Sequence, residues 1–161
     1  MTAGAGPGGP REVLDALRAH VDELTEAVRQ LPAERLEAGA GSAEAGGWTA
    51  RQVLAHLADF ELVAAVRVRM MLSVDHPTLP AYGQEEFTDR FSALETAAEA
   101  LERLTVTRRA TLRVLEAATE ADWDRKGTHP ERGEEPLRRT VEMLSRHDAT
   151  HLAQLRRAAA T

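Results

Sequence analysis

The residues best suited to chemistry in this chain are two histidines one helical turn apart, in the run His147-Asp148-Ala149-Thr150-His151. Histidines at positions i and i+4 of a helix lie on the same face, with their Cβ atoms about 5–6 Å apart. This spacing lets two imidazoles bind one metal ion, as in the H-E-x-x-H metalloproteases. Those enzymes use a glutamate as the base, and the shorter Asp148 at the intervening acidic position weakens the protease interpretation.

His56 is the natural third ligand, because it interrupts an apolar helical stripe between Val53 and Phe60. A polar ring on a buried stripe needs a partner. Three neutral imidazoles leave coordination positions open, which is typical of catalytic and not of structural zinc sites. Imidazole suits several divalent metals, so we expect zinc first, with nickel, iron, cobalt or manganese as alternatives. A hydrogen-bonded core histidine at position 56 remains the competing interpretation.

Two carboxylates are the candidate catalytic residues, Asp59 and Asp148, since either could accept a proton near the metal. Asp59 follows His56 by three residues and could hydrogen-bond its ring or a bound water, as metal-bound histidines commonly require. Gln154 likewise follows His151 by three residues and could hydrogen-bond its ring. For Asp59 and Gln154 the alternative role is ordinary helix solvation or hydrogen bonding between helices. Three histidines are not counted as ligands: His20, His76 and His129.

Apolar residues at helical spacing predict an all-α, four-helix bundle that would position these side chains. The expected helices cover residues 11–31, 50–72, 84–119 and 137–159, and the segments 32–47, 75–83 and 121–136 are expected to be loops. The second helix has the clearest start, where Thr49 and Gln52 can form a capping box. Residues 1–10, rich in Gly, Ala and Pro, are expected to be a disordered lead-in to one domain over residues 11–160.

The amino-acid composition of the chain limits the kinds of molecule it is expected to bind. The chain has 161 residues, a net charge of −6 and no cysteine. Nucleic-acid binding needs clustered basic charge, and no apolar run approaches the roughly 18–20 residues that span a membrane. We therefore expect a cytoplasmic protein with a small-molecule substrate and with neither nucleic acid nor membrane as a partner. A cysteine nucleophile is excluded, so any thiol must come from a cosubstrate.

Two strings in the sequence resemble motifs of the DinB/YfiT-like family across about residues 12–158. The first is Trp-Thr at 48–49 followed by VLAHLAD at 53–59, and the second is HDxxHxxQ at 147–154, preceded by Asp-Trp at 122–123 and by the Gly and Pro residues at 127, 130 and 133. The resemblance implies an up-down-down-up four-helix bundle, a metal site formed by His56, His147 and His151, and in many members a homodimer.

The resemblance also suggests activities. Some members of the family resemble thiol transferases that use mycothiol, bacillithiol or glutathione, and a metal would activate the thiol or a water as a Lewis acid. The leading hypothesis is thus a metal-dependent thiol S-transferase acting on a small electrophile. A metal-dependent hydrolase or isomerase comes second. A non-enzymatic protein that binds metal or a small ligand, and a helical interaction module with structural histidines, are the alternatives outside enzymology.

Overall fold

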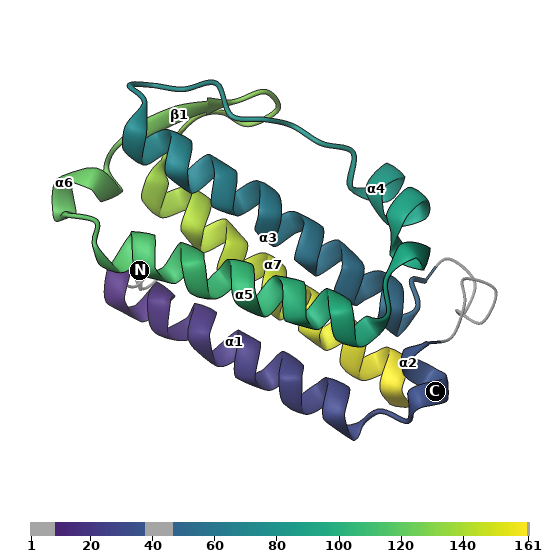
Figure 1. Ribbon diagram of the computed structural model, residues 1–161. Helices are drawn as coiled ribbons and strands as arrows, with labels where there is room; N and C mark the ends of the chain where they lie inside the picture. Colours follow the sequence, from purple (N-terminus) through teal and green to yellow (C-terminus); the bar gives the residue numbers. More distant parts are fainter. Residues whose placement is uncertain (1–8, 38–46, 161) are drawn as a thin grey trace, which may run out of the picture.

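Four long helices lie side by side in the computed structural model, which describes residues 9–37 and 47–160 (Figure 1). They are α1 (Pro10–Gln30), α3 (Ala50–Ser73), α5 (Ala97–Glu116) and α7 (Leu137–Ala160). Helices α1 and α7 run in one direction and α3 and α5 in the other, so the predicted up-down-down-up bundle is confirmed. The predicted lead-in falls largely outside the described residues, and Pro10 already opens α1.

The start of α3 follows the predicted capping box. The Thr49 hydroxyl accepts a hydrogen bond from the backbone N–H of Gln52 at 3.3 Å, and the Gln52 side chain accepts one from the Thr49 N–H at 3.0 Å. This pairing satisfies N–H groups that the first helical turn leaves free. It fixes where the helix begins, and with it the face on which His56 lies two turns later.

The single helix predicted over residues 84–119 is wrong. The segment forms α4 (Gln84–Phe91), the 3-10 turn η2 (Ser92–Leu94) and α5. Thr96 and Glu99 form a second capping box that starts α5 afresh, because their side chains satisfy the backbone N–H groups of a new helix end. The break also changes which residues face the core, because the apolar side chains of Phe91 and Leu94 are 42% and 79% exposed.

The predicted loops also contain regular structure. Residues 32–47 include the short helix α2 (Ala33–Leu36), and residues 121–136 include the end of α6 (Glu120–Trp123) and an antiparallel hairpin of β1 (Lys126–His129) and β2 (Gly133–Pro136). A bridge joins Thr78 to Thr128 of β1, so the α3–α4 connection lies along the hairpin. These elements escape sequence analysis because each is only four residues long and is stabilised by tertiary contacts.

A polar layer divides the core into two apolar clusters. One cluster includes Leu24, Val53, Leu57, Leu104 and Leu155, and the other includes Leu17, Val68, Met71, Leu115 and Leu144. Between them each long helix contributes polar side chains: His20 from α1, His56 and Glu61 from α3, Arg108 from α5, and His147 and Asp148 from α7. The sequence-predicted site residues therefore lie at mid-height in the bundle.

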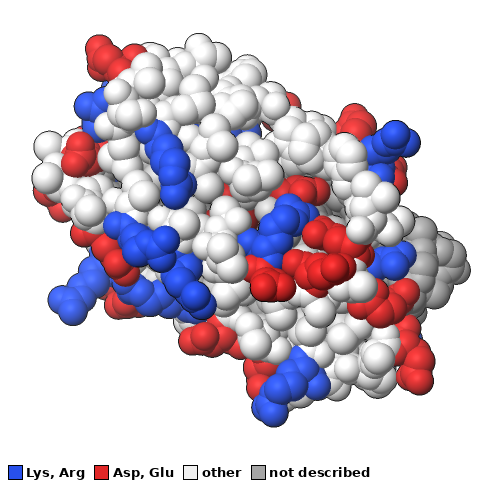
Figure 2. All heavy atoms as spheres, viewed as in Figure 1, with Lys and Arg blue, Asp and Glu red and all other residues white. Residues whose placement is uncertain are grey.

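The molecular surface carries both signs of charge. Figure 2 shows acidic and basic side chains interspersed on the visible face. Within residues 9–37 and 47–160, none of the helices combines the length and apolar character that crossing a bilayer requires.

Candidate metal centre

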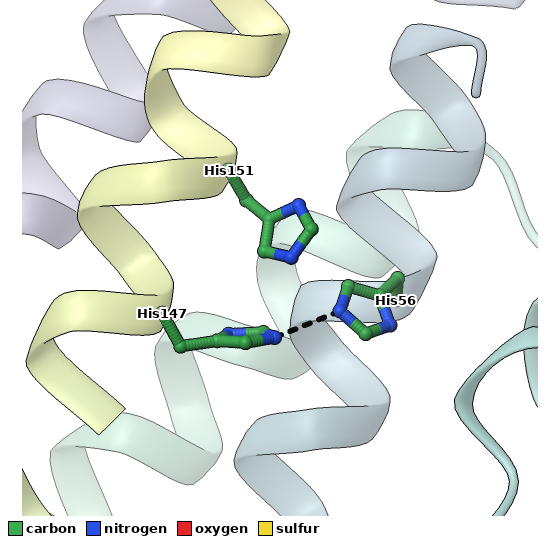
Figure 3. A group of neighbouring side chains, drawn as sticks. All are labelled: His56, His147 and His151. Atoms are coloured by element: carbon green, nitrogen blue, oxygen red, sulfur yellow. Dashed lines mark hydrogen bonds between the residues drawn. The ribbon is translucent and has the colours of Figure 1, made fainter. Parts of the chain in front are cut away.

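The three predicted ligands meet between two neighbouring helices. His56 projects from α3, and His147 and His151 project from α7 toward it (Figure 3). One nitrogen from each ring lies within 4.8 Å of the others, and the Nε2 atoms of His56 and His147 are 2.8 Å apart. Nitrogens bound to one tetrahedral zinc stand about 3.3 Å apart, given Zn–N distances of about 2.0–2.1 Å. The observed nitrogen–nitrogen distances, 2.8 Å for one pair and up to 4.8 Å for the set, lie on either side of that value, so the three residues fit a divalent metal.

Neighbouring side chains hold the imidazoles in place. Phe60 stacks on His147 with ring centroids 3.7 Å apart, and Trp48 stacks on His151 at 6.0 Å. Gln154 Oε1 lies 2.8 Å from Nδ1 of His151, as the sequence suggested. Because the amide oxygen accepts, Nδ1 carries the proton and Nε2 is left with its lone pair free for a metal.

Burial keeps the three imidazoles neutral. Desolvation, followed by the neighbouring imidazoles, lowers the pKa of His56 to about 3 and that of His147 to about 2. Desolvation also lowers the pKa of His151, against smaller raising effects from Gln154 and Asp148. Neutral imidazole is the form that binds metal. The Nδ1 atoms of His56 and His147 are buried and have no hydrogen-bond partner among the described residues.

The lowered histidine pKa values predict acid sensitivity of the metal-free fold. Below about pH 6.5 the unfolded chain protonates these histidines while the folded chain does not, so the free energy of unfolding should fall by up to about 1.4 kcal/mol per pH unit for each such histidine. The raised pKa values of Asp59 and Glu61 have the opposite effect on the free energy of unfolding as the pH falls. The measurement is therefore a comparison: urea unfolding at pH 7.5 and 5.0 for wild type and His147→Leu. On acidification, the free energy of unfolding should fall less for His147→Leu than for wild type. Equal losses in the two proteins would contradict a lowered pKa for His147.

Asp59 lies one helical turn after His56 on α3, and its hydrogen bond goes to α5 and not to the His56 ring. Its Oδ1 accepts a hydrogen bond from Nη1 of Arg103 at 2.8 Å, and Arg103 also pairs with Glu95. The other oxygen, Oδ2, is buried and unpartnered among the described residues. Burial raises the pKa of Asp59, against the lowering effect of Arg103. Sequence reasoning missed Arg103 because nothing in the local pattern of α5 links it to α3.

Asp148 pairs with an arginine and is not part of the histidine cluster. Its Oδ2 lies 2.8 Å from Nη2 of Arg108, which also pairs with Glu61 at 2.8 Å and donates to the Leu17 carbonyl at 3.1 Å. Arg108 is 1% exposed and Glu61 is fully buried. The structure does not bring the carboxylate of Asp148 to the metal-binding nitrogens. The one sequence signal of this network was Arg108, which interrupts the apolar stripe of its helix.

The remaining histidines lie outside the cluster. His20 is at the edge of the polar layer, with Nδ1 3.6 Å from Asp148. His76 is exposed, and its backbone φ of 46° places it in a turn. His129, expected in a loop, is 3% exposed within β1, where Nδ1 accepts from the Glu131 N–H at 3.2 Å.

Comparison with known proteins identifies the family of this chain. The profile of the DinB superfamily matches residues 40–155, a segment that contains all three histidines. The chain belongs to the DinB superfamily.

Two relatives are similar to this chain over most of their length. A Bacillus cereus (strain 03BB102) protein is 26% identical over 139 residues, which are 84% of this chain and 79% of that protein. An Oceanobacillus iheyensis protein is 26% identical over 114 residues, 71% of this chain and 66% of its own. Both relatives carry the provisional name of metal-dependent hydrolase.

Two solved structures share the fold. YfiT from Bacillus subtilis, described by its unusual four-helix bundle topology, superposes with a TM-score of 0.85 at 20% identity, over 99% of this chain and 91% of YfiT. A mycothiol-dependent maleylpyruvate isomerase superposes with a TM-score of 0.74 at 14% identity, over 92% of this chain but 61% of the isomerase. At these identities the likeness establishes the fold alone.

Proposed function

We propose that this DinB-superfamily protein is a metal-dependent hydrolase that acts on a small molecule. The observation that carries the proposal is the cluster of three neutral imidazoles, one buried and two half-buried, with their ligand atoms within 4.8 Å and with the buried carboxylate of Asp59 one helical turn from His56. The names of the Bacillus and Oceanobacillus relatives support the same reaction class. A divalent metal, zinc first, would supply Lewis-acid activation of the nucleophile when bound.

The chain's own residues would handle the proton. Asp59 has one oxygen held by Arg103 and the other unpartnered, so the free oxygen can take a proton from the attacking water and return it to the leaving group. A carboxyl pKa raised by burial makes Asp59 a better proton acceptor than an exposed aspartate. Arg103 would act as a positioning residue, and Trp48 and Phe60 cover the imidazole faces and help to exclude water. Asp148 would stabilise the bundle through Arg108.

A thiol-dependent transferase is the second candidate. The fold shared with the mycothiol-dependent isomerase supports it, and the absence of cysteine requires an external thiol. We place it after hydrolysis because this chain spans 61% of that isomerase, whereas it spans 79% of the Bacillus cereus relative.

The test is turnover of 4-nitrophenyl acetate and 4-nitroacetanilide by metal-loaded protein. Chelation should reduce turnover to background and added metal should restore it. Asp59→Asn should lower kcat by at least about 100-fold, the usual contribution of a general base, with unchanged metal content. Asp89→Asn, at an exposed position of α4, is the matched control.

The outcomes separate the candidates. Undiminished turnover by metal-free protein would refute the metal-dependent mechanism. Conjugation of mycothiol or glutathione to an electrophile, without hydrolysis of either nitrophenyl compound, would favour the transferase. Metal binding without turnover of any of these compounds would favour a binding protein.

A further inference from the structure

The aromatic residues of this chain are concentrated at the metal centre. The sequence contains three Phe, two Trp and one Tyr. Five of the six form one continuous set of ring contacts with the three histidines: Trp48, Phe60, Tyr82, Phe87 and Phe91. Only Trp123 lies elsewhere, in the apolar cluster beneath the hairpin.

This aromatic array runs from the interior to the surface. Its inner end is His56, 1% exposed, and its outer end is Phe91, 42% exposed. From Phe60, which stacks on His147, the centroid distances are 6.4 Å to Tyr82, then 5.0 Å to Phe87 and 5.5 Å to Phe91. A chain with 4% aromatic residues thus gathers most of them into one array that reaches the candidate metal centre, and an apolar or aromatic ligand body would pack favourably against such an array.

Two unpartnered polar atoms lie beside this array. The Tyr82 hydroxyl and Oδ2 of Asp59 are both buried and lack a hydrogen-bond partner among the described residues. Desolvation, followed by the nearby Asp59 carboxylate, raises the pKa of Tyr82, so the phenol stays protonated and is a donor. A buried polar group without a partner costs about 1–3 kcal/mol. A ligand that offers an acceptor to Tyr82 and a donor to Asp59 would recover that cost.

The loop that carries Tyr82 is held firmly. Arg67 of α3, 5% exposed, donates from Nε at 3.1 Å and from Nη2 at 2.6 Å to the Pro80 carbonyl. The N–H of Leu79 donates to the Thr128 carbonyl of β1 at 2.8 Å. These anchors, two and three residues before Tyr82, fix the position of its ring.

We propose that Tyr82 and Asp59 recognise a carboxamide group, with the Tyr82 O–H donating to its carbonyl oxygen and Asp59 accepting its N–H, while an attached apolar or aromatic body packs along Phe60 and Phe87. The inference rests on the proposed hydrolase function and names its substrate class as amides. It also makes Tyr82 a catalytic residue, because a fixed donor stabilises the negative charge that develops on the carbonyl oxygen.

The reaction balances with water as the second reactant. The water oxygen bonds to the carbonyl carbon and the carbon–nitrogen bond breaks. The proton that Asp59 takes from water passes to the leaving nitrogen, so the products are a carboxylic acid and an amine.

Benzohydroxamate is the probe, since it carries a carbonyl, an N–H and an aromatic ring and binds divalent metals. Its affinity for the metal-loaded protein would be measured by calorimetry, with metal content measured in parallel. Tyr82→Phe removes only the hydroxyl and should weaken binding about tenfold, the effect of one hydrogen bond, at unchanged metal content. Acetohydroxamate, which lacks the ring, should bind wild type at least about tenfold more weakly.

The control is Leu94→Ala, which removes a 79% exposed apolar side chain outside the aromatic array and should leave both affinities unchanged. Equal benzohydroxamate affinity in wild type and Tyr82→Phe would overturn the inference and leave the hydrolase proposal standing. The inference would also be overturned, with the hydrolase proposal still standing, if metal-loaded wild type did not bind benzohydroxamate. A wild-type protein that binds no metal would defeat the proposed function itself, and this inference with it.

Discussion

His147→Ala is expected to lose its metal. His147 supplies an Nε2 2.8 Å from that of His56, and a metal left with two protein ligands is bound far more weakly. Loss of a single outer partner of a metal ligand already costs about 10–100-fold in affinity, so loss of the ligand should cost at least about 100-fold. Elemental analysis after dialysis, followed by metal titration, measures the effect.

His56→Ala and His151→Ala should behave in the same way, because each removes one corner of the cluster. His76→Ala is the matched control, since His76 is exposed and outside the cluster. Circular dichroism should confirm that the variants keep their helices, which are stabilised by the apolar clusters. Stoichiometric metal in any one of the three variants would exclude that histidine as a ligand.

Arg108→Met is expected to destabilise the fold by about 3–5 kcal/mol, the usual cost of removing one partner from a buried ion pair. Arg108 is the positive centre between Glu61 and Asp148, and all three residues are 1% exposed or less. Without it, two carboxylates are left in the core with no countercharge. Urea unfolding followed by circular dichroism gives the free energy of unfolding directly.

The control is Arg138→Met, which removes a surface pair with the 69% exposed side chain of Asp124 and should cost no more than about 1 kcal/mol. A triple variant, Arg108→Met with Glu61→Leu and Asp148→Leu, should regain much of the lost stability, because no charge is then left unpaired. A loss below about 1 kcal/mol in Arg108→Met would show that the network contributes little to the fold.

Local sequence determined three of the long helices and the candidate metal ligands. The apolar repeats of α1, α3 and α7 and the Thr49–Gln52 box fixed those helices almost to the residue. The pair His147 and His151 shares a face by helical geometry alone. His56 stood out because it interrupts a buried stripe. Each of these features depends on residues within a few turns of one another, which is why periodicity and capping reveal them.

Tertiary structure decided the chemistry around the ligands. Nothing local places Arg103 against Asp59, or pairs Asp148 with Arg108. Tyr82 lies against Phe60 because Arg67 and the hairpin hold its loop. The short strands exist because they pair with each other and with Thr78 of the α3–α4 connection. These features arise from contacts between residues distant in sequence, whose partners are set by the packing of whole helices and not by local propensity.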